Sequence, residues 1–161
     1  MQSERLPYED LAIILKAIGR VKSPVVEVVD EGWGAVESEI HLEPEFAPGL
    51  KGLDQFSHII IVFFMDKSTF DPAQDLVRRP KGRADMPLLG IFAQRARHRP
   101  NPIGITAVQL LRIEGDVVRV RGLDAIDGTP VLDIKPYFPA FDRVDGPSVP
   151  EWVGRVMEGY F

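Results

Sequence analysis

The sequence predicts a mainly β protein, built as a single antiparallel sheet that closes, or nearly closes, into a barrel with few short helices. Fourteen glycines and fourteen prolines divide the 161 residues into short segments, which disfavours a helical bundle. Residues 58–65 form a continuous apolar, β-branched and aromatic run, as expected of a central strand buried on both faces. Two further apolar or alternating runs, 103–113 and 116–123, are separated by Glu114-Gly115, which is a hairpin signal.

The expected strands are spread along the chain in an order that suits sequential antiparallel pairing. Period-two alternation in the second hairpin strand places two arginines on one face, Arg119 and Arg121, and two valines on the other, Val118 and Val120. The complete set of expected strands is 12–21, 34–42, 58–65, 88–93, 103–113, 116–123 and 131–136.

Helix signals are sparse. Residues 150–158 suit a short helix, because a proline stands at its start, Glu151 follows in the first turn and Gly159 can end it. Residues 72–79 suit a helical turn. We therefore expect helices only as short additions to the sheet.

The composition indicates one soluble, cytoplasmic domain spanning residues 1–161. A hydrophobic fraction of 45% is enough for a core, and the absence of cysteine excludes disulfides and thiolate nucleophiles and suits a reducing compartment. Residues 1–5 carry no basic-then-apolar signal pattern, and the longest apolar run, 59–65, is too short to span a bilayer.

Charge is unevenly distributed along this acidic chain, whose net charge is −5. Two basic clusters lie beside proline or glycine in the middle third of the sequence. Each is compatible with a solvated loop, but together they can receive the phosphates of an RNA or a nucleotide. Their members are Arg78, Arg79, Lys81 and Arg83 in the first cluster, and Arg95, Arg97, His98 and Arg99 in the second.

The second basic cluster runs into a loop that prolines make rigid. Pro100 and Pro102 flank Asn101, and each proline holds the residue before it in an extended conformation. A buried strand is expected to begin directly afterwards, at Ile103. A stiff basic loop that enters a strand suits a site for an anionic or polar ligand.

A second polar constellation starts at a turn, Asp127-Gly128-Thr129-Pro130. In the extended run that follows, alternation places Asp133, Lys135 and Tyr137 on one face with Val131, and Leu132 and Ile134 on the other. Two interpretations stay open. The acid, the amine and the phenol are candidates for catalysis, or the run is a half-buried strand whose outer face carries an Asp–Lys pair.

The histidines do not indicate a metal site. His41, His58 and His98 lack the close spacing of a ligand pair, so we expect no metal. Ser57 and His58 form a polar pair at the start of the apolar run, but adjacent residues of a strand point to opposite faces, so we expect them not to contact one another. A serine hydrolase using Ser57 is therefore disfavoured, and no nucleophile elbow surrounds this residue.

Several motifs, taken in order, resemble the TrmO/TsaA-like family. The resemblance covers residues 18–137 and leaves 138–161 as a C-terminal extension. The motifs are Ile18-Gly19 with Ser23-Pro24, Gly52-Leu53-Asp54-Gln55-Phe56-Ser57-His58, Gly90-Ile91-Phe92-Ala93-Gln94-Arg95, Arg99-Pro100-Asn101-Pro102-Ile103-Gly104, Asp127-Gly128-Thr129-Pro130 and Leu132-Asp133-Ile134-Lys135-Pro136-Tyr137.

The resemblance implies a homodimeric S-adenosylmethionine-dependent methyltransferase, built on a small single-sheet β-barrel. It implies methylation of the N6 amine of a threonylcarbamoyl-modified adenosine beside the tRNA anticodon. Carried over by motif, the implied cofactor-binding residues are Ser57, His58, Arg95, Ile105, Ile126, Asp127, Gly128 and Thr129. The candidates for contact with RNA are Arg78, Arg79, Lys81, Arg83, Arg97 and Arg99.

The chain also departs from the family pattern. The family usually carries a Pro-Arg-Gln motif after its first strand, and residues 25–34 contain no equivalent. Two alternatives therefore stay beside the tRNA methyltransferase, namely a methyltransferase with another substrate and a barrel that binds RNA or a nucleotide without catalysis.

Overall fold

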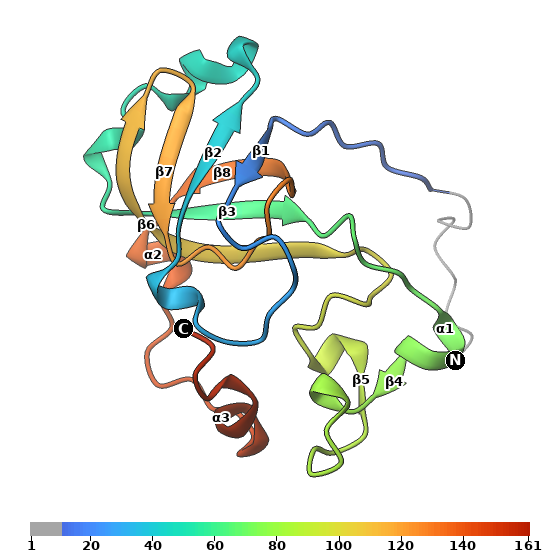
Figure 1. Ribbon diagram of the computed structural model, residues 1–161. Helices are drawn as coiled ribbons and strands as arrows, with labels where there is room; N and C mark the ends of the chain where they lie inside the picture. Colours follow the sequence, from blue (N-terminus) through green and yellow to red (C-terminus); the bar gives the residue numbers. More distant parts are fainter. Residues whose placement is uncertain (1–10) are drawn as a thin grey trace, which may run out of the picture.

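The computed structural model of the protein describes residues 11–161. Its centre is a closed barrel of antiparallel strands in the order β1-β2-β7-β6-β3-β8, which confirms the predicted fold class (Figure 1). The expectation about residues 1–5 lies outside the described residues. The barrel strands are β1 (Gly19–Lys22), β2 (Glu37–Leu42), β3 (His58–Phe64), β6 (Ile103–Glu114), β7 (Val117–Arg121) and β8 (Pro130–Pro136).

Short elements surround this barrel. A small two-stranded sheet lies to one side of it in Figure 1, with the C-terminal helix below the barrel. The expected helical turn near residue 72 and the expected C-terminal helix are both present, each shorter than predicted. These elements are α1 (Pro72–Asp75), β4 (Val77–Arg78), β5 (Leu89–Gly90), α2 (Pro139–Asp142) and α3 (Trp152–Met157), with single-turn or short 3-10 helices η1 (Trp33–Ala35), η2 (Pro44–Leu50), η3 (Leu53–Gln55), η4 (Pro80–Gly82) and η5 (Ile91–Ala93).

Three of the expected strands are shorter in the structure than the sequence predicted. The run 12–21 becomes a strand only at Gly19, since β2 and β8 pair with residues 19–22, and Ile14 upstream is 96% exposed. The run 34–42 starts as the 3-10 turn η1, so strand pairing begins at Glu37. Of 88–93, only Leu89–Gly90 pairs, and the rest is η5. Apolar residues alone do not make a strand where no neighbouring strand completes the hydrogen bonds.

Alternation along the strands fills the barrel. Ile59, Ile61 and Phe63 of β3 point into the core, where they join the buried Val118 and Val120 of β7. The predicted hairpin between β6 and β7 is confirmed, with its turn at Gly115 in the left-handed region. Its two arginines lie outside and form ion pairs with Glu37 of β2, at 3.3 Å from Arg119 and 2.6 Å from Arg121.

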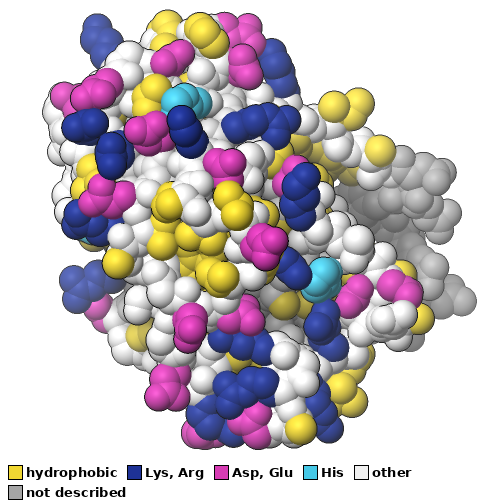
Figure 2. Space-filling view, in the orientation of Figure 1, with side chains coloured by type: hydrophobic (Ala, Val, Ile, Leu, Met, Phe, Trp, Pro, Cys, Tyr) yellow, Lys and Arg dark blue, Asp and Glu magenta, His cyan; other side chains and the backbone are white. Residues whose placement is uncertain are grey.

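The prediction that residues 58–65 are buried on both faces was only partly right: β3 lies between β6 and β8 with one face in the core, but its outward face is partly exposed. Its outward side chains include Val62 and the half-exposed Phe64, which stand opposite Ile105 and Ile103 of β6 in the strand register. We call these four side chains the apolar wall. Figure 2 shows hydrophobic side chains gathered in the middle of the face in view, with lysines and arginines interspersed with acids below them.

One expected alternation was wrong. Val131 was placed on the same face as Asp133 and Lys135, but it is fully buried in the core. The register explains the difference: Val62 is opposite Asp133, whereas Phe63 is opposite Val131, so Leu132 is an extra residue in β8. Such a bulge interrupts the period-two pattern at one point and leaves it intact on either side.

Candidate functional site

The turn at residues 126–129 is clamped to the segment after β1. A carboxylate oxygen of Asp127 accepts a hydrogen bond from the Ser23 backbone N–H at 3.0 Å, and the Asp127 N–H donates to the Val25 carbonyl at 2.8 Å. Gly128 has a φ of 83°, which glycine adopts without strain. The Thr129 hydroxyl donates to the Ile126 carbonyl at 2.7 Å. The turn therefore presents the exposed Asp127 from a fixed backbone.

Arg95 is held against the barrel wall. Its Nη2 donates to the Ile105 carbonyl at 2.7 Å, and both residues are exposed. Val62 of β3 is opposite Ile105 of β6 on one side and opposite Asp133 of β8 on the other. Ile105 therefore lies near the end of the barrel where β8 begins. Arg95, Ile105 and the 126–129 turn thus gather at one end of the barrel.

A half-buried polar bridge joins these two parts of the site. The Thr106 hydroxyl, next to Ile105, donates to Asp124 Oδ1, and the Tyr160 hydroxyl donates to Asp124 Oδ2 at 2.6 Å. Burial raises the pKa of Tyr160 above its ordinary value, the charge of Asp124 adds to the rise, and the charge of Arg95 opposes it. Asp124 therefore connects strand β6, the start of the turn and the C-terminal segment.

The sequence reasoning missed Asp124 and Tyr160 as site residues. A signal for Asp124 existed, because a carboxylate between the apolar Leu123 and Ala125 must find donors, and both neighbours are buried. Tyr160 gave no such signal, since its partner lies 36 residues away in the sequence.

The proline loop is tied down through its basic residues. Arg97 Nε donates to His98 Nε2 at 3.1 Å, so the other ring nitrogen, Nδ1, carries the proton and donates to the Thr69 carbonyl at 2.8 Å. Arg99 Nη1 donates to the carbonyls of Gln94 and Ala96 at 3.0 and 3.2 Å. The predicted rigidity of the loop thus comes from arginine contacts as well as from proline.

Ser57 and His58 lie at the opposite end of β3. The expectation that they do not touch was wrong, because Ser57 Oγ is 2.8 Å from His58 Nδ1. Ser57 precedes the strand, which begins at His58, so strand alternation does not apply to it. His58 is opposite Gln109 in the register, four positions from Ile105, which separates the two ends by about 13 Å along the strand.

The candidate catalytic residues of β8 face outward. Lys135 Nζ forms an ion pair with Asp133 Oδ2 at 2.7 Å, which is the Asp–Lys pair that one interpretation of the sequence predicted. The hydrogen bond from Lys135 to Asp133 raises the pKa of the lysine, so it is a poor proton acceptor at neutral pH. Tyr137 lies beside the Ser57–His58 end, where its N–H donates to the His58 carbonyl at 3.1 Å.

The first basic cluster lies around β4 and η4, and its members have partners within the chain. Arg78 pairs with Asp75 at 3.0 Å, and Arg83 pairs with Asp85 at 2.7 Å. Arg79 donates to the Met86 carbonyl, and Lys81 donates to the Asp30 carbonyl at 3.3 Å. These contacts order the loops and leave charged side chains at the surface.

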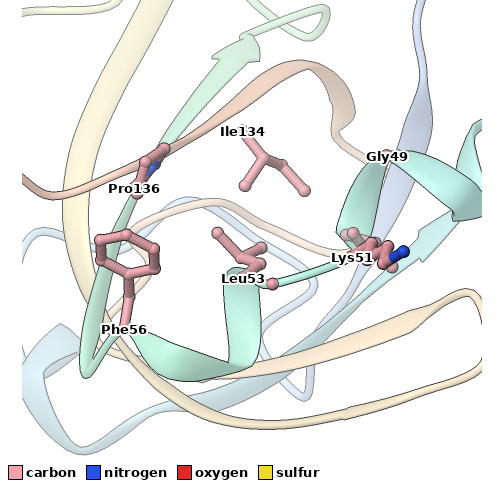
Figure 3. Close-up of a pocket in the computed structure, with 8 residues that line it drawn as sticks. Gly49, Lys51, Leu53, Phe56, Ile134 and Pro136 are labelled. Carbon is pink, nitrogen blue, oxygen red and sulfur yellow. The ribbon is translucent and has the colours of Figure 1, made fainter.

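A shallow hollow lies beyond the Ser57–His58 end (Figure 3). It has a volume of about 250 Å³, and in the close-up Phe56, Leu53 and Ile134 border it with Lys51, Gly49 and Pro136. No predicted site residue lines this hollow. Within residues 11–161 no three acidic or histidine side chains gather as a metal site, and no helix of that part is long and apolar enough to cross a membrane.

Together the fold and the site define a class, a small closed antiparallel barrel with a polar site at the end where β6 and β8 begin on either side of β3. Within that class, the chain belongs to the family of the tRNA-methyltransferase O N-terminal domain, whose model matches residues 30–143. The resemblance inferred from the motifs is thereby confirmed.

Relatives and solved structures agree with this family. A probable S-adenosyl-L-methionine-binding protein of Methanothermobacter thermautotrophicus is 40% identical over 139 residues, covering 84% of this chain and 97% of that protein. A tRNA (adenine(37)-N6)-methyltransferase of Mus musculus is 37% identical over 132 residues, covering 82% of this chain and 30% of that protein. A crystal structure of TrmO from Pseudomonas aeruginosa superposes with a TM-score of 0.73 at 32% identity, covering 89% of this chain. The chain spans 63% of that solved chain.

Proposed function

We propose that this chain is an S-adenosylmethionine-dependent methyltransferase. The observation that carries the proposal is the family match, joined to the placement of Arg95 and Asp127 at one end of the barrel. The cofactor would supply an electrophilic methyl group. A guanidinium and a carboxylate are the complements of the amino-acid end of such a ligand, so the side chains present fit it.

In this arrangement Arg95 receives the ligand carboxylate, and Asp127 accepts from its amine or ribose hydroxyls. Ile105 contributes its carbonyl to Arg95 and so orients the guanidinium. Ile126, Gly128 and Thr129 hold the turn from which Asp127 projects. The acceptor amine would receive the methyl group that the cofactor supplies, and it would lose its proton to a nearby base or to water.

For the methyl acceptor we propose the N6 amine of a threonylcarbamoyl-modified adenosine next to the tRNA anticodon. The mouse relative is named for methylation at adenine N6 of tRNA, which supports this substrate. The basic clusters would then face the phosphates, through Arg78, Arg79, Lys81, Arg83, Arg97 and Arg99. A methyltransferase with another acceptor, or a non-catalytic RNA- or nucleotide-binding barrel, is the alternative, and it fits the absence of the Pro-Arg-Gln motif.

We also propose a homodimer of one barrel domain per chain, with motif core 18–137 and extension 138–161, acting in the cytoplasm. Two features support the dimer. Ser57 and His58 stand about 13 Å along β3 from the Arg95 end, farther than one hydrogen-bonded site requires. The apolar wall includes Ile105, which is 51% exposed, and a second copy would cover it. Light scattering after size exclusion tests the dimer, and a monomer at micromolar concentration would contradict it.

Calorimetry with S-adenosylmethionine and S-adenosylhomocysteine tests the proposed cofactor. Arg95→Ala and Asp127→Ala should each weaken binding by about 1.5–3 kcal/mol, as expected for a lost charged hydrogen bond. Arg119→Ala is the matched control, because this arginine pairs with Glu37 on the outside of β7 and should leave binding unchanged. Absence of binding to either ligand by the unmodified protein would contradict the proposed cofactor.

The reaction itself needs a separate assay. Modified tRNA incubated with protein and S-adenosylmethionine should gain one methyl group on the threonylcarbamoyl adenosine, detected by mass spectrometry of the nucleosides. Cofactor binding without methylation of that nucleoside would favour another acceptor, and RNA binding without cofactor binding would favour the non-catalytic alternative.

A further inference from the structure

The C-terminal segment returns to the barrel and docks beside η1. The carbonyls of Gly159 and Tyr160 accept hydrogen bonds from the N–H groups of Gly32 and Trp33, at 2.9 and 2.8 Å. A Cβ on Gly34 would lie 2.7 Å from the carbonyl carbon of Phe161, so only glycine allows this approach. In Figure 1 the end of the chain accordingly lies next to the short helix η1. This docking site falls in residues 25–34 and their flank, where the Pro-Arg-Gln motif has no equivalent.

The docked segment places one polar group inside the candidate site. The Tyr160 hydroxyl reaches Asp124 Oδ2 at 2.6 Å, and Thr106 occupies the other carboxylate oxygen. Tyr160 and Asp124 are half-buried, and Thr106 is buried. Asp124 thus has a donor from β6 and a donor from the C-terminal segment, and it stands three residues before Asp127.

The C-terminal segment has a second anchor that is independent of this bridge. Arg155 of α3 forms ion pairs with Asp85 at 3.3 Å and with Glu151 at 3.1 Å. Arg83 Nη1 also donates to the Arg155 carbonyl at 3.4 Å. The contacts of Arg155 with Asp85 and Arg83 attach α3 to the end of η4 and the loop after it, and they do not involve Asp124. The attachment of the segment and the hydrogen bond of its tyrosine can therefore be changed separately.

The hydroxyl of Tyr160 prevents Asp124 from pairing with a cation instead. Without the phenol, a carboxylate oxygen of Asp124 would lose its donor in a half-buried setting, where an unpaired charge is costly. Arg95 contacts the Ile105 carbonyl, and the next residue, Thr106, contacts Asp124, so the Arg95 guanidinium is a cation close to this carboxylate. A second cation, Lys81, lies over the Tyr160 ring, 5.8 Å from its centroid. An Arg95–Asp124 pair would then occupy the guanidinium that the ligand carboxylate needs.

We propose that Tyr160 is a positioning residue of the cofactor site: its hydroxyl holds Asp124 away from Arg95 and keeps the guanidinium free for the amino-acid end of the cofactor. The inference rests on the proposed function. It names a role for the C-terminal segment that neither the barrel fold nor the motifs assign.

The test compares two ligands in calorimetry. S-adenosylhomocysteine carries the amino-acid group, whereas 5′-methylthioadenosine lacks it. Tyr160→Phe should weaken S-adenosylhomocysteine binding on the order of tenfold while changing methylthioadenosine binding by less than about twofold. The double variant Tyr160→Phe with Asp124→Asn should recover most of the loss, because a neutral amide does not pair with Arg95. Arg155→Ala should lower the thermal midpoint without changing the ratio of the two affinities.

Equal weakening of both ligands by Tyr160→Phe would show that the tyrosine only supports the fold, and unchanged S-adenosylhomocysteine binding would show that Asp124 needs no such restraint. Either result overturns the inference while the proposed function stands. If the unmodified protein bound neither ligand, the proposed function would fail and this inference with it. Circular dichroism of each variant shows that the barrel is intact before the affinities are compared.

Discussion

Replacing Gly104 by alanine tests whether this motif glycine is required for space. Gly104 lies opposite Phe63 in the β3–β6 register, and a Cβ there would stand 2.3 Å from Phe63 Cζ and 2.4 Å from Cε2. The ring is 3% exposed and packs in the core, so it has no room to move aside. The φ of Gly104 is not in the left-handed region, so backbone strain does not contribute. Forcing extra atoms into a packed core lowers the free energy of unfolding by about 1–3 kcal/mol. Because the approach is so close here, Gly104→Ala should cost about 3 kcal/mol or more.

Urea denaturation followed by circular dichroism measures this loss of stability. The matched control is Gly154→Ala, because a Cβ at Gly154 in α3 meets nothing within 4 Å and alanine favours a helix by roughly 0.5–1 kcal/mol. Adding Phe63→Leu to Gly104→Ala should make the two changes less than additive by about 1 kcal/mol or more, since the smaller side chain relieves the clash. A Gly104→Ala protein within about 0.5 kcal/mol of the unmodified one would refute the steric argument.

Two further predictions concern the core and the buried tyrosine. Ile61→Ala should destabilise the protein by about 2–5 kcal/mol, because Ile61 is fully buried at 0% exposure in the barrel core; a loss below about 1 kcal/mol in the same urea assay would contradict that placement. The pKa of Tyr160 is raised above the ordinary 10.0, so its stabilising contribution is complete below pH 10 and declines as pH rises further, when the unfolded chain ionises first. Between pH 8.5 and about 10.5 the free energy of unfolding should therefore decrease more for the unmodified protein than for Tyr160→Phe. Equal decreases in the two proteins would contradict this coupling.

Much of the barrel followed from local pattern. The run 58–65 is continuously apolar, β-branched and aromatic, and the hairpin around Gly115 carries alternation and turn chemistry, so their positions were correct within a residue or two. The run 12–21 failed because its apolar residues upstream of Gly19 have no pairing strand, which depends on β2 and β8 far away in the sequence. The face of Val131 failed because a single extra residue at Leu132 shifts the register.

The sequence identified individual residues of the candidate site but not which of them lie close together in space. Motif residues such as Arg95 and Asp127 were named from the sequence, and the structure brings their segments to one end of the barrel. Ser57 and His58 were named with them but lie at the other end of β3, because the register of that strand decides the distance. Asp124 and Tyr160 meet only through the return of the C-terminal segment, which is a tertiary contact without a local signal.

The arginines of the basic clusters can hold a loop in place and bind an anionic ligand at the same time. Arg79, Arg95 and Arg99 each donate to a backbone carbonyl, and such contacts hold loops that lack regular hydrogen bonding. A guanidinium carries more N–H donors than these contacts use, and its charge is not neutralised by a carbonyl. The same side chain therefore fixes the loop and keeps its charge for an anionic ligand. Replacing such an arginine by lysine would retain the charge but remove the forked geometry, so Arg95→Lys should bind S-adenosylhomocysteine more weakly than the unmodified protein, and full affinity would mean that charge alone matters at this position.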